Sequence, residues 1–123
     1  MQYTLDEIKN LQANKNLFEG RVFILTSNLT FSSAMLFALD FSDNNLAIIV
    51  GEVPGNSPTS FGAVRSQGLE TPNSKLKVRT TTKKFYRPDT TKDQDRLIPD
   101  VQVPAKDALN KVYELIEKDN ANA

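Results

Sequence analysis

The chain has 123 residues, which is enough for one compact domain that buries about two-thirds of the surface of its unfolded chain. Lysine and arginine together number 15, as do aspartate and glutamate, so the formal net charge is zero. This balance argues against general nucleic-acid binding, which requires an excess of positive charge. There is no His, no Cys and no Trp, which excludes imidazole and thiolate metal ligands, disulfides, cysteine nucleophiles and a Ser-His couple formed within the chain.

The remaining composition, 39% hydrophobic and 24% charged, is typical of a globular protein. The longest apolar stretch, Ala34 to Leu39, is far shorter than the roughly 20 residues of a membrane helix. Residues 1–4 lack the basic and apolar regions of a signal peptide. We therefore expect no membrane contact from this segment. The absence of Cys fits a cytosolic protein and a bacterial exported protein equally, so the localisation stays open.

The amino-terminal residues predict a short amphipathic helix. Thr4–Glu7 has the spacing of a capping box, and apolar residues follow at helical intervals at Leu5, Ile8 and Leu11. This helix is expected to end near Asn14.

Residues 22–50 predict a strand, a helix and a second strand. Val22–Leu25 and Leu46–Val50 are continuous apolar runs, the pattern of strands that are covered on both faces in parallel sheets. Between them, the segment from Ser32 is rich in helix formers and apolar nearly all round, which predicts a helix buried between layers and ending near Asp43–Asn45. Such a unit closes as a parallel crossover.

The next part of the chain predicts a loop and a hairpin. Val53–Gly62 is rich in Gly, Pro and Ser, and strands are expected at Ala63–Leu69 and Leu76–Thr82. In the second of these, Leu76, Val78 and Thr80 face one way and Lys77, Arg79 and Thr81 the other, so it is expected to have one wet face. The lysines of the hairpin and its exit are expected to be solvated; they are Lys75, Lys77, Lys83 and Lys84.

The carboxyl-terminal part predicts one short extended segment and a helix. A charged connector, Lys83–Arg96, leads to Leu97–Val103, which Pro99 keeps out of the centre of a sheet. Pro104 then begins the last helix, and residues 119–123 are expected to form a frayed, disordered tail. The apolar stripe expected on this helix consists of Ala105, Ala108, Leu109, Val112 and Ile116.

The loops after the two parallel strands are the expected place for chemistry. In open parallel sheets, ligands bind outside the carboxyl ends of the strands, so residues 26–32 and 53–62 should meet. Ser32 falls at the start of the predicted helix, where unpaired backbone N–H groups, that of Ser33 among them, can hold an oxyanion. Ser32 is therefore a candidate acyl-transfer nucleophile. Thr30 or Ser32 could equally serve only as the helix N-cap, since no neighbour in sequence can act as a base.

Five ordered motifs resemble the carboxyl-terminal processing (tail-specific) serine peptidases, whose superfamily includes the tricorn core protease and the retinoid-binding repeats of photoreceptors. The motifs are Phe18–Thr26, Thr30–Ala34, Ile49–Glu52 with the Pro-Gly loop behind it, Pro72–Ser74 and Ile98–Val101. Each motif is weak alone, but together and in this order they make the resemblance specific over most of the chain.

The resemblance implies a crotonase-like or Clp-protease-like α/β fold, with a parallel sheet and a strand-helix-strand core followed by a β-hairpin and a carboxyl-terminal helix. Residues 1–123 would then be a single segment, the carboxyl-terminal half of a larger peptidase domain. Ser32 would occupy the nucleophile position, with the Ser33 N–H as an oxyanion donor, and the substrate would be a polypeptide. No metal and no cofactor are implied, and the parent protein is expected to be extracytoplasmic.

Three departures from the family pattern bear on activity. In the Ser-Lys branch, a lysine in the loop after Gly-Glu deprotonates the serine, and Ser57 stands at its position here. The tricorn-like branch uses an upstream histidine, and this chain has none. The resemblance therefore implies that upstream residues supply the base and a second oxyanion donor, and that this segment alone is inactive. Met35 stands where the family often has an acidic residue.

Asn56, Ser57 and Ser60 are candidates for orienting a substrate or a base, although a turn-rich connector would have the same composition. Two other classes of function stay open. The chain could be a non-catalytic binding module of the same fold, or an unrelated α/β interaction domain in which Ser32 is only a cap. Because the missing half of the sheet would leave an apolar edge, we also expect a homo-oligomer, in the form of a dimer.

Overall fold

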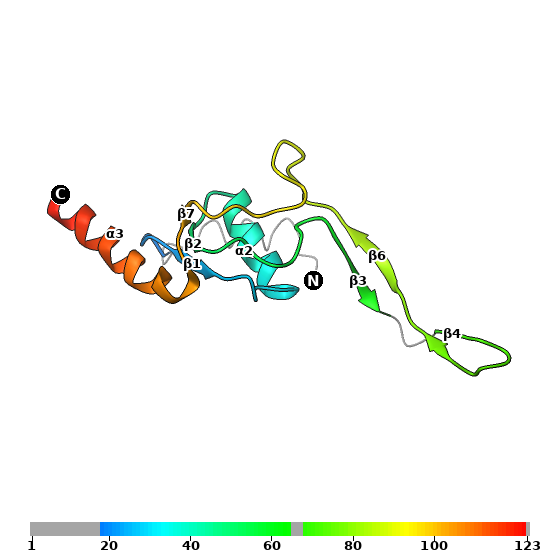
Figure 1. Cartoon of the computed structure of the whole chain (residues 1–123). Helices are drawn as coiled ribbons and strands as arrows, with labels where there is room; N and C mark the ends of the chain where they lie inside the picture. Colours follow the sequence, from blue (N-terminus) through cyan, green and yellow to red (C-terminus); the bar gives the residue numbers. More distant parts are fainter. Residues whose placement is uncertain (1–17, 65–67, 123) are drawn as a thin grey trace.

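The computed structural model of the chain describes residues 18–64 and 68–122. The helix expected over residues 4–14 lies outside the described residues. Figure 1 shows an elongated molecule, with helix α3 (Ala108–Asn122) at one end, an arm of antiparallel strands at the other, and the sheet with helix α2 (Ser33–Asp43) between them. The architecture is mixed α/β with a small parallel sheet, as the sequence predicts.

Within the described part of the chain, three parallel strands form the sheet, in the order β1-β2-β7, with β1 at Phe23–Thr26, β2 at Ile48–Gly51 and β7 at Val101–Gln102. The central strand β2 is covered on both faces as expected, since neither Ile49 nor Val50 is exposed to solvent. Strand β7 lies at an edge, in line with the prediction from Pro99. Strand β2 begins at Ile48, two residues after the start of the apolar run that predicted it.

Leu46 explains the late start of β2. Its N–H donates to the Phe41 carbonyl at 2.8 Å, and Asn45 before it has a φ of 55°. Leu46 therefore belongs to the left-handed turn that ends α2, and its side chain is 60% exposed. The predicted end of the helix near residues 43–45 is confirmed.

Helices α2 and α3 cover opposite faces of the sheet. The α2 cluster consists of Met35, Ala38, Leu39 and Leu97 with Ile24 against it, and the α3 cluster consists of Val50, Ala108 and Val112 with partly buried neighbours. Val50 is in register with Leu25, so it lies on the opposite face from Ile24. The sheet is thus the middle of three layers.

The expectation that α2 is buried all round is wrong for the described residues. Its side chains Leu36 and Phe37 are 40% and 53% exposed. The sheet covers only one side of the helix, and no second layer lies over the other side within the described ranges. On the edge strand β1, Leu25 is also 44% exposed.

Gly51 allows the carboxyl ends of β1 and β2 to approach closely. Its φ is +135°, and a Cβ at this position would lie 2.0 Å from the Thr26 carbonyl oxygen. Next to it, the Glu52 N–H donates to that oxygen at 3.0 Å, and the Thr26 hydroxyl donates back to the Glu52 carbonyl at 2.8 Å. Only glycine fits here. The two hydrogen bonds between Thr26 and Glu52 fix where both loops leave the sheet.

Among its described residues, the arm contains four short strands. Strand β3 (Ser60–Val64) pairs antiparallel with β6 (Thr81–Phe85), and farther out β4 (Leu69–Glu70) pairs with β5 (Lys77–Val78). Each expected hairpin strand is therefore split in two, and Ser60, expected in the loop, is the first residue of a strand. The expected covered face of the second strand is also absent, because the arm extends away from the sheet (Figure 1) and leaves Leu76 and Val78 64% and 55% exposed.

The last helix starts with a 3-10 turn, η1 (Ala105–Asp107), directly after Pro104. A 3-10 helix has three residues per turn and not the roughly 3.6 of an α-helix. Ala105 therefore does not lie on the buried face of α3, and it is exposed. Only two of the five residues predicted for the apolar stripe are buried. Ala108 and Val112 are buried, whereas Leu109 and Ile116 are 51% and 37% exposed, and the partly buried Leu115 takes the third position.

Of the tail that was expected to fray, residues 119–122 are helical. Helix α3 continues through Asn122, and in its last turns Asp119 forms an ion pair with Arg21, which precedes β1. Since Gly and Pro are absent from residues 108–122, nothing in that stretch stops the helix.

An ion pair inside the molecule joins α2 to the segment after the arm. The Arg87 guanidinium donates from Nε and Nη2 to the two Asp43 carboxylate oxygens at 3.0 and 2.6 Å, and both side chains are nearly buried. Arg87 Nη1 also donates to the Asp93 carbonyl at 2.6 Å, and Lys92 Nζ lies 3.2 Å from Asp43. Residues 83–96, expected to be only a charged connector, thus contain a buried anchor.

This anchor predicts a pH-dependent stability. The Arg87 hydrogen bond lowers the pKa of Asp43 most, burial opposes that effect, and Lys92 lowers the pKa further. Because the folded-state pKa lies below the unfolded value of about 4, this stabilisation is present above that pH and is lost as pH falls through the folded-state pKa. Urea titrations should show a steeper loss of unfolding free energy below pH ~4 in the wild type than in Asp43→Asn, which should also be less stable at pH 7. If the unfolding free energies of the wild type and Asp43→Asn fell equally steeply below pH ~4, Asp43 would not contribute to the acid sensitivity of the fold.

Candidate functional site

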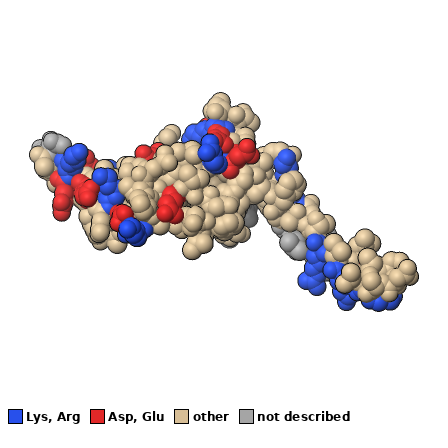
Figure 2. Space-filling model, in the orientation of Figure 1, with Lys and Arg blue, Asp and Glu red and all other residues tan. Residues whose placement is uncertain are grey.

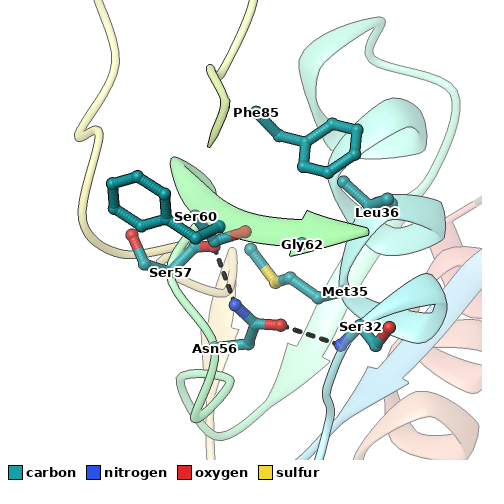
Figure 3. Close-up of a pocket in the computed structure, with 9 residues that line it drawn as sticks. Ser32, Met35, Leu36, Asn56, Ser57, Ser60, Gly62 and Phe85 are labelled. Atoms are coloured by element: carbon teal, nitrogen blue, oxygen red, sulfur yellow. Dashed lines mark hydrogen bonds between the residues drawn. The ribbon is translucent and has the colours of Figure 1, made fainter. Parts of the chain in front are cut away.

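The two loops at the carboxyl ends of β1 and β2 meet, as the sequence predicts. They border a pocket of about 160 Å³, lined by four of the predicted residues: Ser32, Asn56, Ser57 and Ser60. Figure 3 shows these four side chains around one space, with Ser32 at the head of α2 and the others on the facing loop and strand. The remaining wall is mainly apolar and is formed by Met35, Leu36, Phe61, Gly62 and Phe85.

Ser32 has an unusual backbone conformation. Its φ is 54° and its ψ is −124°, which makes it one of the positive-φ residues other than glycine among the described residues. For a residue with a Cβ this conformation costs on the order of 1–3 kcal/mol. Such strain persists only where the surrounding structure enforces it, and it is concentrated at functional sites.

The cap role that the sequence left open for Ser32 and Thr30 does not match the hydrogen bonds. Ser32 is at the N-cap position by sequence, but its hydroxyl makes no capping hydrogen bond. The Thr30 hydroxyl accepts from the Ser27 N–H at 2.9 Å and closes the turn before the helix. The Ser32 side chain therefore does not satisfy the first N–H groups of α2.

The backbone N–H of Ser33 lies in the first turn of α2. The first recorded helical donors at this end are the N–H groups of Ala34, to the Phe31 carbonyl, and Leu36, to the Ser32 carbonyl. Ser33 is the first residue of α2, and its N–H has no recorded acceptor among the described residues. It lies at the positive end of an 11-residue helix.

The three loop candidates have different environments. Asn56 Oδ1 accepts from the Ser32 N–H at 2.8 Å, so Asn56 contacts the Ser32 backbone (Figure 3). The Ser57 hydroxyl donates to the Gln94 carbonyl at 3.1 Å and is thus engaged away from Ser32. Ser60 lines the pocket from the first position of β3.

Gln94 supports the loop that borders the pocket, a role that the sequence does not predict. Its carbonyl accepts from the Thr59 N–H and its side chain accepts from the Thr59 hydroxyl, at 3.0 and 2.9 Å. It is held in turn by hydrogen bonds from its amide to the carbonyls of Asp89 and Lys92. No local motif signals this role, since Gln94 lies 35 residues from Thr59 in the chain.

Glu52 holds the first loop against the start of the last helix. Its carboxylate accepts from the Ala105 N–H at 3.1 Å and from the Asn28 N–H at 3.2 Å. These two backbone hydrogen bonds, that of Ala105 first, lower the pKa of Glu52 against a small opposing effect of burial. The carboxylate thus acts as a fixed acceptor at the edge of the sheet.

None of the residues that line the pocket has a titratable acid or base in its side chain. The arm lysines are exposed and lie outside the lining, and Figure 2 shows Lys and Arg gathered on the outer part of the arm. Within residues 18–64 and 68–122, no group of three acidic, His or Cys side chains is placed to hold a metal ion. In the same described ranges, no helix is long and apolar enough to cross a membrane.

Comparison with known families assigns the class of the protein. A protein-family model matches residues 2–103, which is most of the chain, and its family consists of serine peptidases. The chain belongs to peptidase family S41, so the predicted relationship to the carboxyl-terminal processing peptidases is confirmed. Searches among curated proteins and among solved structures found no match.

The backbone of Ser32 predicts an unusual response to glycine. Ser32→Gly should be more stable than Ser32→Ala, with a free energy of unfolding higher by about 1–3 kcal/mol, because glycine adopts a positive φ without strain. Urea denaturation of the two variants measures this difference. As a control, the same pair at Ser42 inside α2 should show the reverse order by about 1 kcal/mol. A more stable Ser32→Ala would contradict the positive φ.

Proposed function

We propose that this chain is the nucleophile-bearing segment of a serine peptidase that cleaves polypeptides. The observation that carries the proposal is the strained Ser32 at the head of α2, beside a pocket and next to the free N–H of Ser33. A serine held on a sharp strand-to-helix turn, followed by a donor N–H, is an arrangement that suits acyl transfer. Membership of a serine peptidase family supports the same reaction.

The mechanism follows from these groups. Ser32 Oγ attacks the scissile carbonyl carbon while the base takes its proton. The tetrahedral intermediate then expels the amine, which receives that proton, and water hydrolyses the resulting acyl-enzyme with return of a proton to Ser32 Oγ. The Ser33 N–H stabilises the oxyanion, for which one donor contributes about 3 kcal/mol. The second donor, a backbone N–H, and the base that accepts the serine proton lie upstream in the complete peptidase domain.

We assign the base to upstream residues because the pocket lining contains no titratable group. Ser57 stands where the Ser-Lys branch has its lysine, and its hydroxyl is engaged with Gln94. The tricorn-like arrangement, with an upstream histidine, fits this chain better than the Ser-Lys arrangement. This segment alone is then inactive, and its sheet is the carboxyl-terminal half of a crotonase-like domain.

The same lining favours a second candidate function. A pocket without a base also fits a non-catalytic homologue that binds a polypeptide without cleaving it. The two functions make opposite predictions for the reactivity of Ser32.

A fluorophosphonate probe separates these functions. In a chain that includes the residues upstream of Met1, the probe should label Ser32, and Ser32→Ala should lose essentially all labelling, because the phosphonyl group is transferred to an activated serine oxygen. Ser74→Ala, in the turn of the arm, should label as the wild type does. Intact-protein mass spectrometry measures the adduct. A folded, unlabelled wild-type chain would favour the non-catalytic function.

We also propose that the segment by itself forms a dimer. The support is apolar surface at the edge of the sheet and on α2, where Leu25, Leu36 and Phe37 are 44%, 40% and 53% exposed. Sedimentation velocity should show a dimer whose population increases with protein concentration. A monodisperse monomer at high concentration would contradict the proposal.

A further inference from the structure

The strained backbone of Ser32 requires a group that enforces it. Ser32 lies between the turn closed by Thr30 and the first turn of α2, and neither supplies a hydrogen bond to its N–H. The recorded partner of that N–H is Asn56 Oδ1 at 2.8 Å, across 24 residues of chain. The contact joins the loop after β2 to the backbone of the candidate nucleophile.

The orientation of the Asn56 carboxamide is fixed by its two partners. Oδ1 faces a donor, the Ser32 N–H, and Nδ2 donates to the Ser57 carbonyl at 3.0 Å (Figure 3). Exchanging the two ends would place N–H against N–H and oxygen against oxygen, so only one orientation satisfies both contacts. Both ends are engaged within the protein.

The loop that carries Asn56 is itself anchored on both sides. Ahead of it, Gly55 packs so closely that a Cβ there would lie 2.3 Å from the Asn28 carbonyl oxygen and 2.6 Å from the Phe31 ring. Behind it, the Ser57 hydroxyl and the Thr59 N–H both donate to the Gln94 carbonyl. An acceptor on such a loop can hold a strained N–H in place, because its own position is over-determined.

We propose that Asn56 is a positioning residue that holds the backbone of Ser32 in its positive-φ conformation and thereby aims the serine hydroxyl at the pocket. Asn56 does not touch the substrate in this role, which differs from the orienting role expected from the sequence. The engaged Ser32 N–H is unavailable to an oxyanion, so the neighbouring Ser33 N–H takes that function. The effect on reactivity rests on the proposed function, whereas the effect on the backbone does not.

Amide hydrogen exchange of the 123-residue chain, followed by NMR, tests the backbone effect directly. Asn56→Ala should accelerate exchange of the Ser32 N–H by about tenfold or more, since it loses its acceptor. Asn56→Asp keeps an acceptor for the Ser32 N–H but places an oxygen against the Ser57 carbonyl, so its exchange rate should lie between those of the wild type and Asn56→Ala. Asn73→Ala, in the turn of the arm, is the matched control and should leave the rate unchanged.

The effect on reactivity is tested with the fluorophosphonate probe in the chain with its upstream residues. Asn56→Ala should slow labelling of Ser32 by at least about tenfold, and Asn56→Asp, which keeps only the acceptor, should label at an intermediate rate. Unchanged exchange at Ser32 in Asn56→Ala would overturn the proposal, as would faster exchange throughout the chain, which would indicate a role in the whole fold. If the wild type is not labelled, the proposed function fails, and the exchange experiment still decides the role of Asn56.

Discussion

The close approach of Thr26 and Gly51 at the end of the parallel sheet is the constraint on which the site depends. Gly51 has no Cβ, so the Thr26 carbonyl can lie against it and accept the Glu52 N–H. The two strands consequently end side by side, and their loops start within reach of each other. With any side chain at residue 51, the loop that carries Asn56 would be displaced from Ser32.

Longer-range contacts then fix the far side of that loop. Arg87 joins the end of α2 to the segment after the arm, and Gln94 in this segment holds the loop through Ser57 and Thr59. These contacts thus hold the carboxyl end of the helix that Ser32 precedes and the far side of the loop that faces Ser32. This support is what the strained backbone of Ser32 requires, because strain without support relaxes.

The sequence predicts the sheet and the position of the site, but not the long-range contacts that support the site. The strand-helix-strand unit and the meeting of the two loops follow from apolar runs and parallel topology, which are local signals. The roles of Arg87 and Gln94 could not be predicted, since their partners lie 44 and 35 residues away and depend on the folded arrangement. The covered faces of α2 and of the arm were predicted wrongly, because an apolar pattern does not say which layer covers it.

The central claim, that Ser32 is a positioned nucleophile served by the Ser33 N–H, is tested most directly by a crystal structure of the phosphonylated protein with its upstream residues. Phosphorus should be bonded to Ser32 Oγ, one phosphonyl oxygen should lie about 2.7–3.1 Å from the Ser33 nitrogen, and the contact of Asn56 with the Ser32 N–H should be intact. Phosphorus on another residue, or a phosphonyl oxygen turned away from Ser33, would contradict this claim.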